Sequence, residues 1–168
     1  MDLKQKMQRN IQKMFAARGD HDVYMELVSD MCMVNTEAHL VFYFGNNMSV
    51  KDARDLISKV SDISEKQRVI VIVQGSVTSQ AKHMLNDTEI QVFKSTFFHY
   101  SPIEHEFVPK HTLLTSNEKS DLIQKIPAHQ LPKIRKDDVV AMFYGAQIGN
   151  VFMIERDKNL YYRIVVAS

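Results

Sequence analysis

Five consecutive apolar residues, Val69-Ile70-Val71-Ile72-Val73, restrict the fold more than any other stretch of the sequence. β-Branched residues favour strands, and a strand without alternating polar positions must be covered on both faces. The neighbouring stretches complete a pattern: residues 38–44 and 89–93 predict strands, and residues 49–60 and 78–85 predict helices. Strands that alternate with helices favour a layered sheet, so we expect an α/β sandwich over roughly the first hundred residues.

The remaining stretches of this first part are less uniform. Residues 3–17 predict a helix, because apolar side chains recur on one helical face: Leu3, Met7, Ile11, Met14 and Phe15. Gly19 follows as a helix stop. Residues 21–37 fit either a helical stripe or a strand, and residues 96–100 predict a further extended segment.

The second part of the chain is punctuated by Pro109 and Pro132, which disfavour helix around them. Thr115 and Glu118 are spaced as a capping box, so a helix is expected to begin there and to bury Leu122, Ile123 and Ile126. A second helix is expected to begin at Asp137 and Asp138 and to end at Gly145.

The C-terminal stretch predicts a β-hairpin. Residues 151–155 and 160–166 alternate as strands, and Asp157-Lys158-Asn159 forms the turn between them. We therefore expect a small mixed α/β module with a terminal hairpin. The boundary falls near Tyr100-Ser101-Pro102-Ile103, which predicts an N-terminal module over residues 1–101 and a C-terminal module over residues 102–168.

Charge and composition exclude several classes of protein. The 21 basic and 20 acidic side chains give a net charge of +1, which argues against a protein that binds nucleic acid mainly by neutralising phosphates. The single cysteine, Cys32, excludes an internal disulfide and suits a reducing compartment. No apolar run reaches the length of a membrane span, and the N-terminal stretch has no apolar core of a signal peptide.

Catalytic and metal-binding patterns are weak. His99, His105 and His111 are separated by prolines and are too far apart in sequence for a short zinc motif, so we expect His105 and His111 to bond backbone groups around a turn. Cys32 lies in an apolar run typical of an inert buried thiol. We expect no catalytic residue, no metal site and no cofactor.

A metal-dependent nuclease is the enzymatic alternative, because an α/β layer can carry paired carboxylates at strand ends. Asp62 precedes the strand predicted at Val69–Val73 by several residues, and Glu89 offers a second acid. Gln91 stands where such a site needs a lysine, which weakens the hypothesis. Loss of Mg²⁺-dependent cleavage in the variant Glu89→Ala would be its test.

Two motifs in the second part resemble a known family. The run HEFVPKH over residues 105–111 and the pair LPKI over 131–134 and DVVA over 138–141, with Tyr144-Gly145, resemble the fifth subunit shared by eukaryotic RNA polymerases I, II and III. The same part of the chain also resembles a small archaeal polymerase subunit that consists of this module alone. Tyr161-Tyr162-Arg163 is similar to the family's terminal strand. The likeness is close over residues 105–168 and loose before them.

The resemblance implies a non-catalytic subunit of two modules. Its C-terminal module would dock on the largest polymerase subunit, and its N-terminal module would have a restriction-endonuclease-like fold without the active site. The residues expected to form the docking surface are those that match the family motifs: His105, Glu106, Val108, Pro109, Lys110, His111, Leu131, Pro132, Ile134, Tyr144, Gly145, Tyr162 and Arg163. Four aromatic residues are candidates for apolar surface hidden only in the assembly, and the alternative for each is an ordinary core position: Phe143, Tyr144, Phe152 and Tyr162.

The N-terminal module would form part of the polymerase jaw, near downstream double-stranded DNA. Thr78 and Ala81 match two positions of a Thr-Pro-Ser-Ala motif that the family places in a loop close to this DNA, whereas Ser79 and Gln80 depart from it. Hydroxyls at a helix start can bond phosphate oxygens. The same residues also suit a plain helix cap, with Thr78 or Ser76 bonding backbone amides.

The resemblance also implies where the chain works. The chain would work inside the cell, in the nucleus of a cellular host or, for a virus-encoded polymerase of a diverged lineage, in the virion or a cytoplasmic factory. The alternative from a different class is a free-standing adaptor that uses the same module to bind other proteins.

The chain also departs from the family at one place. Where the family has basic residues after the second helix, this sequence has Ala146-Gln147-Ile148-Gly149.

Overall fold

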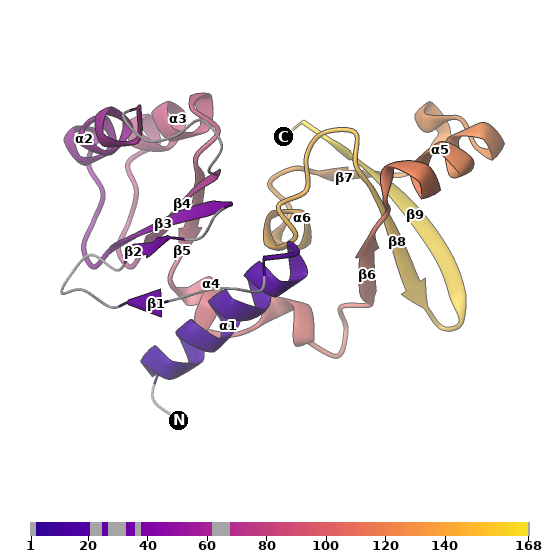
Figure 1. The fold of residues 1–168 in the computed structure, drawn as a ribbon, viewed down its shortest axis with the longest axis horizontal. Coiled ribbons are helices and arrows are strands. Elements are labelled where there is room, and N and C mark those ends of the chain that lie inside the picture. The colour runs from indigo at the N-terminus through magenta and orange to yellow at the C-terminus, as the bar shows by residue number, and fades with distance from the viewer. Residues whose placement is uncertain (1–2, 21–24, 27–32, 36–37, 62–67, 168) are drawn as a thin grey trace. The chain divides into compact units, whose positions relative to one another are not determined.

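The computed structural model describes residues 3–20, 25–26, 33–35, 38–61 and 68–167. The chain divides into two compact units, Met1–Tyr100 and Ser101–Ser168. Figure 1 shows the helices and strands of each unit. Among the described helices, none is long and apolar enough to cross a membrane.

The first unit is built on a five-stranded sheet with the order β1-β2-β3-β4-β5. The strands are β1 (Met25–Glu26), β2 (Met33–Asn35), β3 (His39–Phe44), β4 (Arg68–Val73) and β5 (Gln91–Lys94). The last three are parallel, and β1, β2 and β3 pair antiparallel. The predicted strand of five apolar residues is confirmed as β4, and it pairs with a strand on each side.

Two helices, α2 (Val50–Ser61) and α3 (Ser79–Asp87), lie on one side of this sheet (Figure 1). Their buried residues Ala53, Leu56, Ala81 and Leu85 share one core with alternate residues of the strands. These strand residues are Leu40, Phe42, Val69, Val71 and Val73. Their spacing of two is that of side chains on one sheet face, and the strand–helix order predicted for residues 38–93 is confirmed.

The opposite face of the sheet is covered by α1 (Leu3–Ala17) and α4 (Thr96–His99) (Figure 1). The Phe15 ring lies 5.0 Å from the His39 ring, centroid to centroid, and Asn10 Nδ2 donates to the Phe98 carbonyl over 2.8 Å. The predicted helix over residues 3–17 is confirmed. It ends before Gly19, whose φ of +85° is in the left-handed region that favours glycine.

One element of the first unit was predicted wrongly, and one stays only partly described. Residues 96–99 form the helix α4 and not an extended segment. Residues 33–35 form a strand, so the strand interpretation is confirmed there, whereas residues 21–24, 27–32 and 36–37 lie outside the described part of the chain.

The second unit contains a four-stranded sheet with the order β6-β8-β9-β7. Its elements in chain order are η1 (Pro102–Glu104), β6 (Lys110–Leu113), α5 (Ser116–Lys125), η2 (Ala128–Gln130), β7 (Lys133–Arg135), α6 (Val139–Phe143), β8 (Val151–Arg156) and β9 (Asn159–Val166). Strands β6, β8 and β9 pair antiparallel, whereas β7 pairs parallel to β9.

The helices and the hairpin of the second unit confirm the sequence-based predictions. Thr115 and Glu118 form the capping box at the start of α5, and the Asp138 carboxylate accepts the Val140 amide at the start of α6. In the hairpin turn Asp157 and Lys158 have φ of +49° and +67°, the conformation of a two-residue type I′ turn. No side chain of α5 is buried, so the expected burial of Leu122, Ile123 and Ile126 is incomplete.

Candidate docking groove

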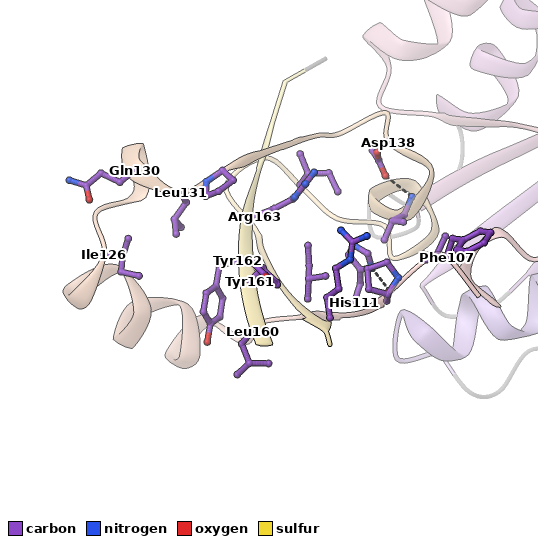
Figure 2. A pocket seen from close by; sticks show the side chains of 17 residues that line it. Phe107, His111, Ile126, Gln130, Leu131, Asp138, Leu160, Tyr161, Tyr162 and Arg163 are labelled. Carbon is purple, nitrogen blue, oxygen red and sulfur yellow. Dashed lines mark hydrogen bonds between the residues drawn. The ribbon is translucent and has the colours of Figure 1, made fainter. Parts of the chain in front are cut away.

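Residues from both family-like motifs and from the terminal hairpin line one pocket of about 700 Å³ in the second unit. We call this pocket the docking groove. Figure 2 shows Ile126, Gln130 and Leu131 on one side of β9, and His111, Phe107 and Asp138 on the other. The lining residues are Phe107, Val108, Pro109, His111, Ile126, Gln130, Leu131, Pro132, Ile134, Asp138, Val140, Ile154, Arg156, Leu160, Tyr161, Tyr162 and Arg163.

The pairing of the strands explains why segments distant in sequence meet here. His111 of β6 pairs with Ile154 of β8, and Ile154 pairs with Tyr161 of β9. The β7 residue Ile134 pairs with Val165 at the other side of β9. The two motifs are thus joined through the hairpin, which lies between β6 and β7 in the sheet.

His111 is held in the groove by a local turn. Its Nδ1 lies 2.7 Å from the Pro109 carbonyl oxygen, and its ring packs edge-on against Phe152 with centroids 5.8 Å apart. Burial lowers the pKa of His111, Arg163 lowers it further, and the Pro109 carbonyl and Asp138 oppose this shift. The imidazole is therefore neutral at pH 7. The predicted bond from His111 to backbone around a turn is confirmed.

The groove combines exposed apolar surface with two arginines. Phe107 is 79% exposed, Leu160 55%, and Tyr161 51%, which are high values for large apolar side chains. Arg156 and Arg163 make no ion pair with any described residue, whereas the nearby Arg135 is held by both oxygens of Asp137. The groove therefore presents apolar side chains together with two arginines that no described carboxylate pairs, while the Asp138 carboxylate also lines it.

Eight of the residues expected at the docking surface line this groove: Val108, Pro109, His111, Leu131, Pro132, Ile134, Tyr162 and Arg163. The others lie elsewhere. His105 and Glu106 are exposed, and the His105 ring accepts the Phe107 amide, as expected for a turn. The Lys110 ammonium pairs with Glu155 at 3.1 Å.

Tyr144 and Gly145 belong to the interior side of the unit. Gly145 is buried with φ of +61°, and the Tyr144 ring packs against Phe152, while burial raises the pKa of its hydroxyl. Phe143 and Phe152 are buried, so for them the alternative of an ordinary core position is confirmed and the docking-surface hypothesis was wrong. The exposed large apolar residues of the groove are instead Phe107, Leu160 and Tyr161.

Several residues that line the groove were not predicted, although they lie in or near segments that the sequence singled out. Phe107 lies inside the first motif, and Ile126 was assigned to a helix face expected to be buried. Arg156, Leu160 and Tyr161 lie near the hairpin turn. Their positions at the groove depend on strand register, which a single sequence does not give for short strands.

The predicted DNA-proximal loop follows β4. The Thr78 side chain accepts the Ala81 amide over 3.3 Å and caps α3, so the helix-cap interpretation is confirmed. Ala81 is fully buried, so its side chain is part of the core and not available to a ligand. Besides Gln74 and the capping Thr78, the exposed residues here are Ser76, Ser79, Gln80 and Lys82.

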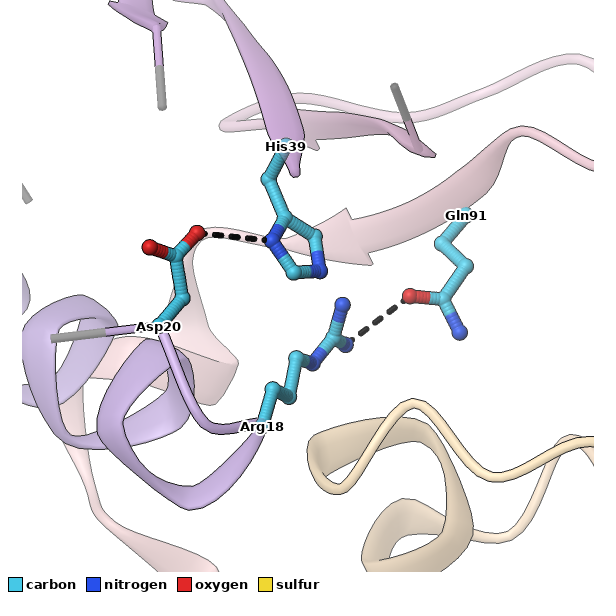
Figure 3. Close-up of polar contacts among 4 residues, drawn as sticks. All are labelled: Arg18, Asp20, His39 and Gln91. Atoms are coloured by element: carbon cyan, nitrogen blue, oxygen red, sulfur yellow. Dashed lines mark hydrogen bonds and ion pairs between the residues drawn. The ribbon is translucent and has the colours of Figure 1, made fainter. Parts of the chain in front are cut away.

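The nuclease hypothesis finds little support in the first unit. Gln91 accepts a hydrogen bond from Arg18 over 2.8 Å (Figure 3). Glu89 is exposed with φ of +60°, and Asp62 lies outside the described residues. Burial, with Arg68 nearby, lowers the pKa of Arg18 to about 9, so the guanidinium keeps its charge at pH 7. Within the described ranges, no group of three or more His, Cys, Asp or Glu side chains is arranged to hold a metal ion.

His39 and Asp20 form the other polar contact in this region, with Nδ1 and Oδ2 3.1 Å apart (Figure 3). Burial lowers the pKa of His39, although the hydrogen bond to Asp20 opposes the shift. The ring is thus neutral at pH 7, and its contact with the carboxylate is a hydrogen bond that joins the end of α1 to the sheet.

Comparison with known proteins places the second unit among polymerase subunits. The family model described as RNA polymerase Rpb5, C-terminal domain, matches residues 100–166. A subunit RPABC1 of DNA-directed RNA polymerases I, II, and III from Dictyostelium discoideum is 37% identical over 112 residues, which cover 60% of this chain and 56% of the relative. The Caenorhabditis elegans protein of that name is 33% identical over 110 residues, covering 59% and 52%.

An archaeal relative is matched almost over its full length. The DNA-directed RNA polymerase subunit Rpo5 of Methanothrix thermoacetophila is 36% identical in an alignment of 70 residues that covers 38% of this chain and 90% of the relative. By contrast, the chain spans about half the length of the eukaryotic relatives that it matches.

Proposed function

The chain belongs to the family of RNA polymerase subunits that includes Rpb5 and the archaeal Rpo5, and on this basis we propose that it is a non-catalytic subunit of a multisubunit DNA-directed RNA polymerase. Its second unit docks on the largest subunit. The observation that carries this proposal is the convergence of residues from both family motifs in one groove.

Three properties of the groove support docking by a protein. Its large apolar side chains are exposed in the isolated chain, and its volume is that of a small-ligand or peptide site. Its two arginines have no ion-pair partner in the part of the chain that the structure describes. Protein interfaces are enriched in aromatic residues and arginine. The groove lies wholly within the unit that the family model matches, so the shared segment and the proposed docking surface coincide.

We assign the first unit to the polymerase jaw, near downstream DNA, with a restriction-endonuclease-like fold that lacks catalysis. The parallel β3-β4-β5 sheet with helices on both faces is compatible with this fold. The exposed loop at Ser76–Gln80, with Lys82 beside it, offers hydroxyls, amides and one charge to phosphates. A photo-crosslinker at Gln80 in the assembled polymerase should label downstream DNA, and labelling of protein alone would contradict this placement.

This proposal implies that the chain works wherever its polymerase transcribes, in the nucleus of a cellular host or in the virion or cytoplasmic factory of a virus. Association with the polymerase is the decisive test. The tagged chain, at native expression, should recover the two large catalytic subunits in near-equal amounts. Recovery of unrelated partners without them would favour the adaptor function instead.

A matched pair of aromatic residues sharpens this test. Phe107 and Tyr100 are both 79% exposed, but only Phe107 lines the groove. The variant Phe107→Ala should reduce recovery of the catalytic subunits about tenfold, because truncation of a buried interface aromatic commonly costs more than 1 kcal/mol. Tyr100→Ala should leave recovery unchanged. Equal recovery with both variants would remove the groove from the docking surface.

A further inference from the structure

Strand β9 is longer than the strand that covers its outer side. On its inner side β9 pairs with β8 from Asn159 to Ile164. On its outer side β7 pairs with β9 only from Ile164 to Val166. The outer edge of β9 from Asn159 to Arg163 therefore has no neighbouring strand among the described residues.

The hydrogen bonds identify which backbone groups lie at this edge. Val165 N donates to the Asn150 carbonyl on the inner side, and Ile164 N donates to the Pro132 carbonyl on the outer side. Because successive residues of a strand direct their N–H and C=O to opposite sides, Leu160 and Tyr162 direct theirs outward. Within the described ranges no backbone group bonds to them at this edge.

Pro132 is the reason that the parallel pairing stops. In a parallel ladder, Ile164 bonds to the two residues that flank its partner Lys133. If the ladder continued toward the hairpin, the next carbonyl of β9 to accept a bond would be that of Tyr162, and its donor would be the amide of residue 132. Proline has no amide hydrogen. The pairing ends at this residue, and the docking groove lies beside the edge that it leaves open, with Ile126, Gln130 and Leu131 on the side of β9 away from His111 (Figure 2).

The two faces of β9 beside this edge differ in chemistry. Leu160 and Tyr162 lie on one face because they are two residues apart, and Tyr161 and Arg163 lie on the other. Arg156, opposite Asn159 in the hairpin, is on the same face as Arg163. The Leu160 face also carries Glu155 and Lys110, which are paired with each other, so that face has no free charge from this pair. An added strand would thus direct alternate side chains toward Leu160 and Tyr162 on one face, and toward Tyr161 and the two arginines on the other.

We propose that the open edge of β9 receives an extended segment of the partner protein as a fifth strand of the sheet, and that this segment alternates apolar with acidic side chains. The proposal rests on the docking function above and specifies how the docking occurs. Main-chain bonds to Leu160 and Tyr162 would supply affinity, and the two faces would supply specificity. A second copy of this chain suits the edge poorly, because it would bring further arginines to Arg156 and Arg163.

A proline substitution at the edge tests the proposal. The variant Leu160→Pro removes an outward amide hydrogen and leaves the bonds to β8, which come from the odd-numbered residues, in place. The control Leu160→Val keeps the amide hydrogen and the apolar side chain. Recovery of the catalytic subunits by the tagged full chain should fall about tenfold with Leu160→Pro and less than about twofold with Leu160→Val.

Hydrogen exchange gives an independent measurement on the unaltered chain. The backbone amides of Leu160 and Tyr162 should exchange at least about tenfold more slowly in the polymerase than in the free chain. The exchange rate of the backbone amide of Asn117, an exposed residue of α5, should not change. Circular dichroism and the thermal midpoint confirm that Leu160→Pro is folded. If that variant unfolds, the exchange experiment decides.

The outcomes separate the two proposals. Loss of recovery with Leu160→Pro alone, or protection of the Leu160 and Tyr162 amides in the complex, supports strand addition. Equal recovery with both variants, or unprotected amides in an intact complex, overturns strand addition and leaves the docking function standing. Failure of the unaltered chain to recover the catalytic subunits overturns the docking function, and strand addition with it.

Discussion

His111 shows how one side chain links the turn of the first motif to the stability of the second unit. Its ring contacts the Pro109 carbonyl and Phe152, and burial keeps it neutral at pH 7. Protonation would place a charge in a half-buried site next to Arg163. The residue therefore makes the unit sensitive to mild acid.

The pKa of His111 is lowered by folding, so the unfolded chain binds a proton at higher pH than the folded chain. Stability contributed by the neutral ring is present above the ordinary pKa of about 6.5 and is lost as the pH falls through that value toward the lowered one. Urea midpoints at pH 7.5 and 5.5 should differ less in His111→Gln than in the unaltered chain. The pKa of His39 is lowered in the same direction, and its effect on stability is common to both proteins, so it does not enter the comparison. An unchanged difference would contradict the role of His111.

At the scale of elements, the loops after β3 and β4 are joined to each other. Met48 N donates to the Ser76 carbonyl over 2.8 Å, Thr78 N donates to the Met48 carbonyl over 3.2 Å, and the Asn47 side chain accepts the Ser76 amide over 2.8 Å. Gly75 allows this approach, because a Cβ there would lie 2.7 Å from the Asn47 backbone nitrogen. The loop proposed to lie near DNA is thus held by its neighbour.

This contact predicts opposite outcomes for two glycines at similar places in the two loops. Gly75→Ala should lower the free energy of unfolding by about 1–3 kcal/mol, because the added methyl group overlaps backbone that cannot move easily. Gly45→Ala should change it by less than about 0.5 kcal/mol, since a Cβ at Gly45 meets nothing within 4 Å. Chemical denaturation measures both, and equal effects would refute the argument from crowding.

Long or strongly patterned elements could be predicted from the sequence, whereas short ones could not. The run of β4 and the caps of α5 and α6 carry their own local signals. The helix α4 has only four residues, two of them phenylalanines that favour strands, and its position depends on Phe98 packing against Phe93. Strand β6 depends on partners 39 to 45 residues away in sequence and β7 on partners 31 residues away, so no local pattern predicts them.

The docking groove was half predictable for the same reason. The family motifs supplied Val108, His111 and Leu131, but only strand register brings the hairpin residues Leu160 and Tyr161 beside them. The open edge itself follows from the proline that precedes β7 and from the greater length of β9. Neither feature predicts an open edge until the pairing of the strands is known.

At the scale of the whole molecule, the second unit contains nearly all of the segment that the family model matches, residues 100–166. The archaeal Rpo5 is covered over 90% of its length by an alignment of only 70 residues. We therefore expect the fragment 101–168 to fold alone, because its own core, around Ile134, Ala141 and Phe152, is contained within it. Cooperative thermal unfolding and dispersed amide NMR signals would be the evidence. A fragment without cooperative unfolding would show that the second unit needs the first.

Arg156 and Arg163 also determine how the chain behaves before it meets a partner. An uncovered strand edge with leucine and tyrosine invites association between copies, and charged side chains beside such an edge oppose it. Salt shortens the range of that repulsion, to about 8 Å at 0.15 M ionic strength. Raising the ionic strength therefore acts twice against assembly, since it weakens the attraction of an acidic partner and lets free copies approach one another.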